Sequence, residues 1–196
     1  MNVFQTLVLI MISGILTENF LLTKFLGICP FLGVSDKISG SLGMGIAVTI
    51  TMVVATLFTF PIYMYILIPL NLTYLYIIAF ILIIALIVQL LEMIMRKHMK
   101  SLHKSLGVYL SLITTNCSIL GVTKINIDPA LGYNLGLALF NSLCTGIGFL
   151  AVMLIFSTIR ERIFQSDVPD SLKGAPITLI AAAIMSLSLV GFSGMA

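Results

Sequence analysis

Apolar stretches about as long as a bilayer is thick run through most of this sequence. Sixty percent of its residues are hydrophobic and only 9% are charged, whereas soluble domains carry about 25% charged residues. A helix needs about 20 apolar residues to cross the hydrocarbon core of a membrane. The sequence therefore predicts an all-α, polytopic membrane protein with several transmembrane helices. The six predicted helices cover residues 3–23, 39–60, 72–95, 105–123, 131–158 and 175–195.

Because these helices take up nearly the whole chain, residues 1–196 are predicted to form a single integral membrane domain. This leaves no room for a water-exposed catalytic domain, and the chain has no P-loop, dinucleotide fingerprint or HExxH motif. The net charge of +3 indicates no nucleic-acid partner, because the basic residues mostly lie at helix ends. The first helix is predicted to be retained, since the residues before it lack the positive charge of a signal peptide.

Basic residues gather in alternate connections between the predicted helices. Lys37 lies in the first connection, four basic residues lie in the third (96–104), and three lie in the fifth (159–173). The second connection (61–71) has no lysine or arginine, and the fourth has Lys124 alone. Lysine and arginine are enriched on the cytoplasmic side of membrane proteins. The pattern predicts that both termini lie on the outer face of the membrane.

A seven-residue phrase that starts with cysteine occurs once in each half of the chain. Residues 29–35 read C-P-F-L-G-V-S, and residues 117–123 read C-S-I-L-G-V-T. A later Leu-Gly pair, at 42–43 and at 131–132, extends the similarity. An odd number of helices in each half makes the second copy enter the membrane from the opposite side. We therefore predict an inverted 3+3 repeat. Its halves are residues 1–97 and 98–196, approximately.

Both copies are predicted to lie on broken or re-entrant segments. In the first copy, Gly27 and Pro30 interrupt the apolar run, and proline removes a backbone hydrogen-bond donor. We interpret residues 20–34 as the broken segment. In the second copy, residues 114–116 (Thr-Thr-Asn) precede Cys117, and polar side chains can satisfy backbone groups that a break sets free. Irregular backbone at membrane depth must be covered by protein, so both segments are expected inside the bundle or against neighbouring proteins.

Cys29 and Cys117 occupy matching positions of the two copies, so they are the candidate metal ligands of this chain. Thiolate pairs suit iron–sulfur, zinc or copper(I) centres. An all-thiolate iron–sulfur cluster needs four cysteines. Two more thiols would then have to come from another chain, most simply from a homologous one. Cys144 matches nothing in the other half and is interpreted as a small packing residue.

Two groups of charged residues have a functional interpretation beside a structural one. Glu18 lies within the first apolar stretch, and a carboxylate inside a membrane is a candidate functional group, here on a possible ion pathway. A protonated or hydrogen-bonded structural carboxyl is an equally good interpretation. The Arg-Glu-Arg run at 160–162 is interpreted as a solvated helix end, with docking of a partner's acidic surface as the alternative.

Several segments of the chain, taken together, resemble a known family. They include N-F-L-L-T-K-F-L-G-I-C-P-F-L-G-V (19–34), L-I-T-T-N-C-S-I-L-G-V (112–122) and I-R-E-R (159–162). Over nearly its whole length the chain is similar to the RnfA/NqrE family of membrane proteins. One branch belongs to the Rnf complex and the other to the sodium-pumping NADH:quinone reductase. The Rnf branch is the better match, and the two cysteine motifs are the most specific part of the resemblance.

The resemblance implies a translocase of the bacterial cytoplasmic (inner) membrane. Such a complex passes electrons between reduced ferredoxin and NAD and couples this oxidoreductase reaction to transport of Na⁺ or H⁺. The chain would have no activity by itself. Cys29 and Cys117 would ligate an intramembrane 2Fe–2S cluster shared with a homologous, oppositely inserted protein, RnfE. The B, C, D and G components of the Rnf complex are implied as further partners within the lipid bilayer or beside it.

Without the resemblance, the residues are compatible with other functions. Inverted repeats with broken helices also occur in small secondary transporters, in which the two cysteines would be dispensable. A scaffold protein whose cysteines only pack is a further alternative. Within the family, the equivalent component of the sodium-pumping NADH:quinone reductase is the other candidate. Iron and acid-labile sulfide in the gently purified complex would separate the redox component from the transporter and the scaffold.

Overall fold

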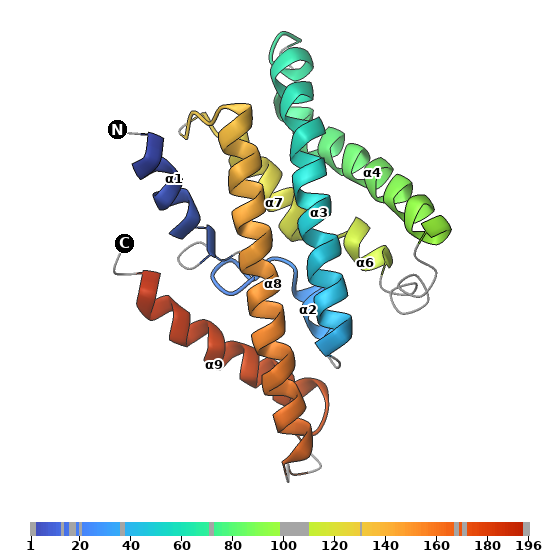
Figure 1. Cartoon of the computed structure of the whole chain (residues 1–196), viewed down its shortest axis with the longest axis vertical. Helices are drawn as coiled ribbons and strands as arrows, with labels where there is room; N and C mark the ends of the chain where they lie inside the picture. The colour runs from blue at the N-terminus through green and yellow to red at the C-terminus, as the bar shows by residue number, and fades with distance from the viewer. Residues whose placement is uncertain are drawn as a thin grey trace.

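The computed structural model of this chain describes residues 3–12, 14–15, 19, 21–35, 38–70, 73–98, 110–129, 131–166, 169 and 172–193. The regular elements within these residues are helices (Figure 1), so the prediction of an all-α protein is confirmed for the described part. They are α1 (Val3–Ile12), α2 (Ile28–Val34), α3 (Ile38–Ile62), a π-helical turn (Tyr63–Leu67), a 3₁₀ turn (Thr73–Leu75), α4 (Tyr76–His98), α6 (Leu110–Thr114), α7 (Cys117–Asn126), α8 (Leu135–Gln165) and α9 (Ala175–Ser193).

Three helical segments of the described chain are long and apolar enough to cross a membrane. They are Ile38–Leu67, Tyr76–Ile94 and Leu135–Gln165, with 30, 19 and 31 residues. They overlap the second, third and fifth helices predicted from the sequence. α9 contributes a shorter apolar stretch, Ala175–Ser188, within the sixth. The first and fourth predicted helices are both interrupted, and these interruptions form the site described below.

The first predicted helix is shorter than expected because the chain leaves helical geometry partway along it. α1 ends at Ile12, and residues 21–27 lie between helices. The Asn19 side chain is buried near this break and forms hydrogen bonds with backbone groups. Its Nδ2 donates to the carbonyl of Gly148 on α8 at 3.2 Å. The prediction of a continuous helix over 3–23 is therefore wrong.

Pro30 does not break the first cysteine segment, contrary to the sequence prediction. It is the third residue of α2 and is buried. The first backbone N–H groups of a helix have no partner within the helix, so a proline there removes nothing that the helix uses. The break lies at Gly27, the other interruption that the sequence predicted, and the prediction is confirmed there. The φ of Gly27 is 86°, in the left-handed region that glycine adopts without steric cost.

α3 and α8 pack side by side through the middle of the molecule and run in opposite directions (Figure 1). Near one end, the hydroxyls of Thr56 on α3 and Ser142 on α8 lie 2.7 Å apart. Near the other, Ser157 of α8 donates to the Ser35 carbonyl just before α3, at 3.1 Å. Between them an added Cβ on Gly146 would lie 2.6 Å from an α3 side chain, so the two backbones approach closely. The two polar contacts are about 22 Å apart along α8, which fits within a ~30 Å hydrocarbon core.

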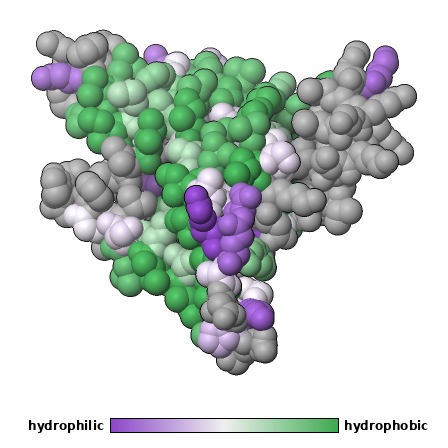
Figure 2. All heavy atoms as spheres, turned by 60° about the horizontal axis from the view of Figure 1, so that its bottom comes forward, coloured by the Kyte–Doolittle hydropathy of each residue, from purple (hydrophilic) through white to green (hydrophobic). Residues whose placement is uncertain are grey.

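The outer surface of the described chain is largely apolar. Large hydrophobic side chains such as Ile78, Leu82 and Leu187 are 65%, 64% and 72% exposed. Figure 2 shows hydrophilic residues only as small separate patches on a hydrophobic face. A surface of this kind is stable against lipid tails or against other membrane proteins, in agreement with the predicted membrane protein.

A buried polar network joins the end of α7 to α3 and α8. Asn126 Nδ2 donates to Ser142 Oγ at 2.8 Å and to Thr56 Oγ1 at 3.2 Å, and its Oδ1 accepts from Asn141 Nδ2 at 2.8 Å. All four residues are no more than 7% exposed. In a low-dielectric interior such a network holds its helices in one arrangement, because a lost partner leaves an unsatisfied buried group.

We expect Asn126→Ala to lower the free energy of unfolding by about 1–3 kcal/mol, the usual cost of leaving buried polar groups without partners. Thermal unfolding in detergent would measure it. Ser188→Ala is the matched control, because Ser188 is exposed and its hydroxyl donates only to the nearby Met185 carbonyl. Equal unfolding temperatures for the two variants would contradict the assigned role of the network.

Candidate functional site

The two cysteine motifs, far apart in the sequence, meet in the structure. The backbone N–H of Gly27, two residues before Cys29, donates to the Cys117 Sγ at 2.9 Å. The Ser118 hydroxyl donates to the Leu26 carbonyl at 2.7 Å. Two hydrogen bonds therefore fasten the turn that leads into the first motif to the start of the second motif.

The seven positions of the two motifs are buried in the same pattern. Cys29 and Cys117 are exposed, the next two residues of each motif are buried, the following two are half-buried, and the last two are buried. The third position, for example, is 2% exposed at Phe31 and 0% exposed at Ile119. Both motifs thus turn their cysteines outward and their large apolar side chains into the core.

Each cysteine lies in the first turn of a short helix, for different local reasons. Cys117 is the first residue of α7, and the side chain of Asn116 caps that helix by accepting from the Ser118 N–H at 3.0 Å. Cys29 is the second residue of α2, which has no side-chain cap and begins after the left-handed Gly27. The sequence prediction that residues 114–116 would satisfy backbone groups at a break is confirmed at Asn116.

The two short helices leave this meeting point in opposite directions. α2 ends beside the C-terminal part of α8, where Ser157 donates to the Ser35 carbonyl. α7 ends beside the N-terminal part of α8, where Asn126 donates to Ser142. The meeting point at Gly27 and Cys117 therefore lies between two levels that are about 22 Å apart along α8. The cysteines are therefore level with the middle part of α8, which is one of the three helical segments long and apolar enough to cross a membrane.

The surroundings of Cys117 fit a sulfur-bound metal cluster. Hydrogen bonds to the ligating sulfurs tune the potential of iron–sulfur clusters, and the Cys117 sulfur already accepts one from the Gly27 N–H. The neighbouring Asn116 is 3% exposed, and its Nδ2 is a buried donor that has no partner among the described residues. Orphaned donors of this kind call for an explanation, and an acceptor brought by a bound group would provide one.

Cys29 and Cys117 do not have a third potential ligand beside them in the described chain. Within the described residues, no three His, Cys, Asp or Glu side chains lie close enough together to hold a metal ion. Because both thiols are exposed, further ligands can reach them from outside. The arrangement is therefore suited to a site completed by another chain.

The remaining predicted residues lie elsewhere. Cys144 is 3% exposed on α8 and packs against Gly14, as expected of a packing residue. Glu18, the candidate for an ion pathway, lies outside the described residues.

The prediction for the charged run at the end of α8 is partly wrong. Glu161 and Arg162 are exposed, as expected of a solvated helix end. Arg160 is half-buried instead, and its Nη1 donates to the Leu32 carbonyl at 2.8 Å and to Ser35 Oγ at 2.7 Å. The sequence contains no signal for this contact, because 125 residues separate Arg160 from Ser35.

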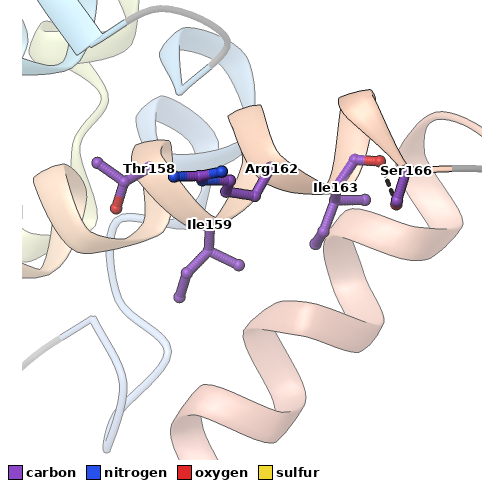
Figure 3. Close-up of a pocket in the computed structure, with 5 residues that line it drawn as sticks. All are labelled: Thr158, Ile159, Arg162, Ile163 and Ser166. Atoms are coloured by element: carbon purple, nitrogen blue, oxygen red, sulfur yellow. Dashed lines mark hydrogen bonds between the residues drawn. The ribbon is translucent and has the colours of Figure 1, made fainter.

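Two hollows in the described surface are lined by residues of the C-terminal part of α8. One hollow has a volume of about 450 Å³. Figure 3 shows five of the residues that line it, with Arg162 pointing along α8 toward Thr158. A groove of about 570 Å³ between α8 and α9 is lined mainly by apolar residues such as Ile155 and Ile184. No motif residue lines either hollow, so neither belongs to the cysteine site.

Comparisons with known proteins agree on one family. A family model described as "Rnf-Nqr subunit, membrane protein" matches residues 7–196. The A component of the Na⁺-translocating ferredoxin:NAD⁺ oxidoreductase complex of Acetobacterium woodii is 51% identical over 191 residues, which are 97% of this chain and 98% of that protein. The A component of the ion-translocating oxidoreductase complex is 47% identical in Shigella boydii and 46% in Escherichia coli K12. Both of these matches span 187 residues, 95% of this chain and 96% of the relative.

Proposed function

The chain belongs to the Rnf-Nqr family of membrane proteins, and we propose that it is the RnfA component of an ion-translocating oxidoreductase complex. The complex passes electrons between reduced ferredoxin and NAD and couples this to ion transport. The named relatives cover nearly the whole chain, so the assignment applies to the chain as a whole and not to one segment. The protein has no activity of its own and works within the assembled complex.

Within that complex we assign Cys29 and Cys117 as two of the four ligands of a 2Fe–2S cluster. The observation that carries this assignment is the 2.9 Å hydrogen bond from Gly27 N–H to Cys117 Sγ, because it brings the two cysteine motifs together. When bound, such a cluster accepts and releases one electron at a time. Gly27 and the Asn116 cap fix the Cys117 sulfur, and the buried residues behind both cysteines exclude water from one side of the site.

The other two ligands would come from the homologous RnfE, in agreement with the exposure of both thiols. The B, C, D and G components complete the proposed complex in the bacterial inner membrane. Glu18 stays a candidate for the ion pathway, and Na⁺ and H⁺ are both possible cargo for a carboxylate.

The proposed topology is six spans arranged as an inverted 3+3 repeat with both termini outside. The matched burial of the two motifs supports a repeat. The opposite directions of α2 and α7, and of α3 and α8, support its inversion (Figure 1). In this arrangement the interruptions after α1 and after α6 are equivalent breaks of the first and fourth spans, both beside the proposed cluster.

Metal analysis of the gently purified complex tests the proposal. We expect iron and acid-labile sulfide in excess of what the soluble-domain cofactors explain, and loss of that excess when this protein is deleted. The opposing result is an unchanged metal content together with solute transport by the isolated chain in vesicles. That outcome would favour a secondary transporter, a class that also uses inverted repeats with broken helices.

A further inference from the structure

α2, which carries Cys29, is too short to hold its own conformation. It has seven residues, and no side chain caps its start at Gly27. Isolated helices shorter than about 12 residues are marginal even in favourable sequences. α7, which carries Cys117, has ten residues and the Asn116 cap. Contacts from other elements are therefore needed to hold Cys29 in place. Cys117 needs them less, because α7 is longer and capped.

One face of α8 supplies these contacts. The ring of Phe156 stacks on Phe31 with centroids 3.9 Å apart. One residue further along, Ser157 Oγ donates to the Ser35 carbonyl at 3.1 Å. One turn beyond, Arg160 Nη1 donates to a backbone carbonyl and to a hydroxyl at the end of α2. Residues 156, 157 and 160 lie on one side of a helix, so α8 binds α2 along a single stripe.

The second motif meets the same need from within its own helix. The carbonyl of Leu120 accepts from the Thr123 hydroxyl of the same helix at 2.9 Å. At the matching position of the first motif, the Leu32 carbonyl accepts from Arg160 of α8 at 2.8 Å. Ser35, which corresponds to Thr123, also accepts from Arg160 through its Oγ. Arg160 thus supplies from a distant helix the hydrogen bond that α7 makes for itself.

An arginine suits this position because of its charge and its shape. The last carbonyls of a helix lack backbone partners, and a cation at that end is favoured by the helix dipole. Its hydrogen bonds to neutral acceptors are charge-assisted and short. The guanidinium also lies over the Phe164 ring, 5.6 Å from its centroid, a contact that a planar cation makes better than an ammonium group does.

We propose that Arg160 is a positioning residue for the Cys29 sulfur. This inference rests on the proposed function and deepens it. Leu32, whose carbonyl Arg160 holds, is one helical turn from Cys29, so a shift of α2 moves the sulfur relative to Cys117. The positive charge of Arg160 also favours an electron on the nearby cluster. Its removal therefore changes both the geometry and the reduction potential of the site.

The test uses the assembled complex with Arg160→Gln, Arg160→Lys and, as the matched control, Arg162→Gln. Arg162 lies on the same helix, and its side chain is exposed. The midpoint potential is measured on the complex with its cluster, and the alkylation rate of Cys29 is measured after the cluster has been removed with an iron chelator, because a sulfur bound to iron does not react. Arg160→Gln should lower the midpoint potential. It should also raise the alkylation rate of Cys29 about tenfold, which corresponds to ~1.4 kcal/mol. Arg160→Lys should change both less, and Arg162→Gln should change neither.

A second variant covers the case in which Arg160→Gln does not assemble. Ser35→Ala keeps the arginine charge and removes one of its acceptors, so Cys29 alkylation should rise while the potential shifts less. Identical alkylation rates in the wild type, Arg160→Lys and Ser35→Ala would overturn the proposal. A wild-type complex without the cluster would instead refute the proposed function. Alkylation of Cys29 would still report whether Arg160 holds α2, so the two failures are distinguishable.

Discussion

Cys29→Ser and Cys117→Ser should each remove the intramembrane cluster from the complex and stop electron transfer through it, whereas Cys144→Ser should leave both intact. A hydroxyl is a harder and far less acidic ligand than a thiol, so an iron site that loses one of four thiolates is not retained. The expected loss is near complete for either variant. Electron paramagnetic resonance of the dithionite-reduced complex and its iron content are the measurements.

Cys144→Ser is a strict control because Cys144 is of the same residue type and lies on a buried face of α8, 3% exposed. Co-purification of the other components shows whether each variant still assembles. A cluster signal that survives in both Cys29→Ser and Cys117→Ser would contradict the ligand assignment. Loss of the signal in all three variants would show that assembly, and not ligation, is sensitive to these cysteines.

The sequence predicted the long helices well because one physical rule determines them. Segments such as α3, α4 and α8 are long and mainly apolar, and the cost of unsatisfied backbone groups in lipid makes each of them a helix. The two cysteine motifs could also be recognised as copies of one another, since both keep the same residue types at most positions. The family resemblance rested on those motifs, and the comparisons over residues 7–196 confirm it.

The breaks were harder to place because single side chains determine them. At the first break, the Asn19 side chain bonds to the Gly148 carbonyl, 129 residues further along the chain. Pro30, one of the two expected interruptions, lies in the first turn of α2 and does not break the helix, whereas the other, Gly27, does lie at the break. Hydropathy predicts neither the contact of Asn19 nor the position of Pro30 within its helix, because it averages over a window and contains no information about distant partners.

The later Leu-Gly pair, which extended the repeat in the sequence, does not extend it in the structure. Gly43 is buried inside α3, whereas Gly132 lies in the turn before α8 with a left-handed φ of 55°. These glycines therefore do not occupy equivalent places, although the cysteine motifs do. Arg160 was missed for a similar reason, because its acceptors on α2 are brought to it only by the packing of α8.

Gly27→Ala should destabilise the protein strongly and lower the cluster content with it. An L-residue at the left-handed φ of 86° costs roughly 1–2 kcal/mol. The new Cβ would also lie 2.3 Å from Ser118 Oγ and 3.1 Å from the Phe149 ring, and overpacking of this kind adds another ~1–3 kcal/mol. Thermal unfolding of the complex and its iron content would measure the two effects.

Gly132→Ala separates the two costs. Its φ of 55° is also left-handed, but no atom lies within 4 Å of the added Cβ, so only the backbone strain remains. The double variant Gly27→Ala/Ser118→Ala removes the nearest clashing atom, and it should be more stable than the sum of the two single changes implies. Additive effects would mean that the turn at Gly27 does not rest on the second motif.

The cluster content gives this comparison its functional meaning. Gly27 donates its N–H to Cys117 and precedes Cys29 by two residues, so a displaced turn moves one sulfur and removes a hydrogen bond from the other. Gly132 touches neither cysteine motif. Gly27→Ala should therefore lose iron even at temperatures where it stays folded, and Gly132→Ala should keep it. Equal iron content in the two variants would refute the idea that the contact between the two motifs builds the metal site.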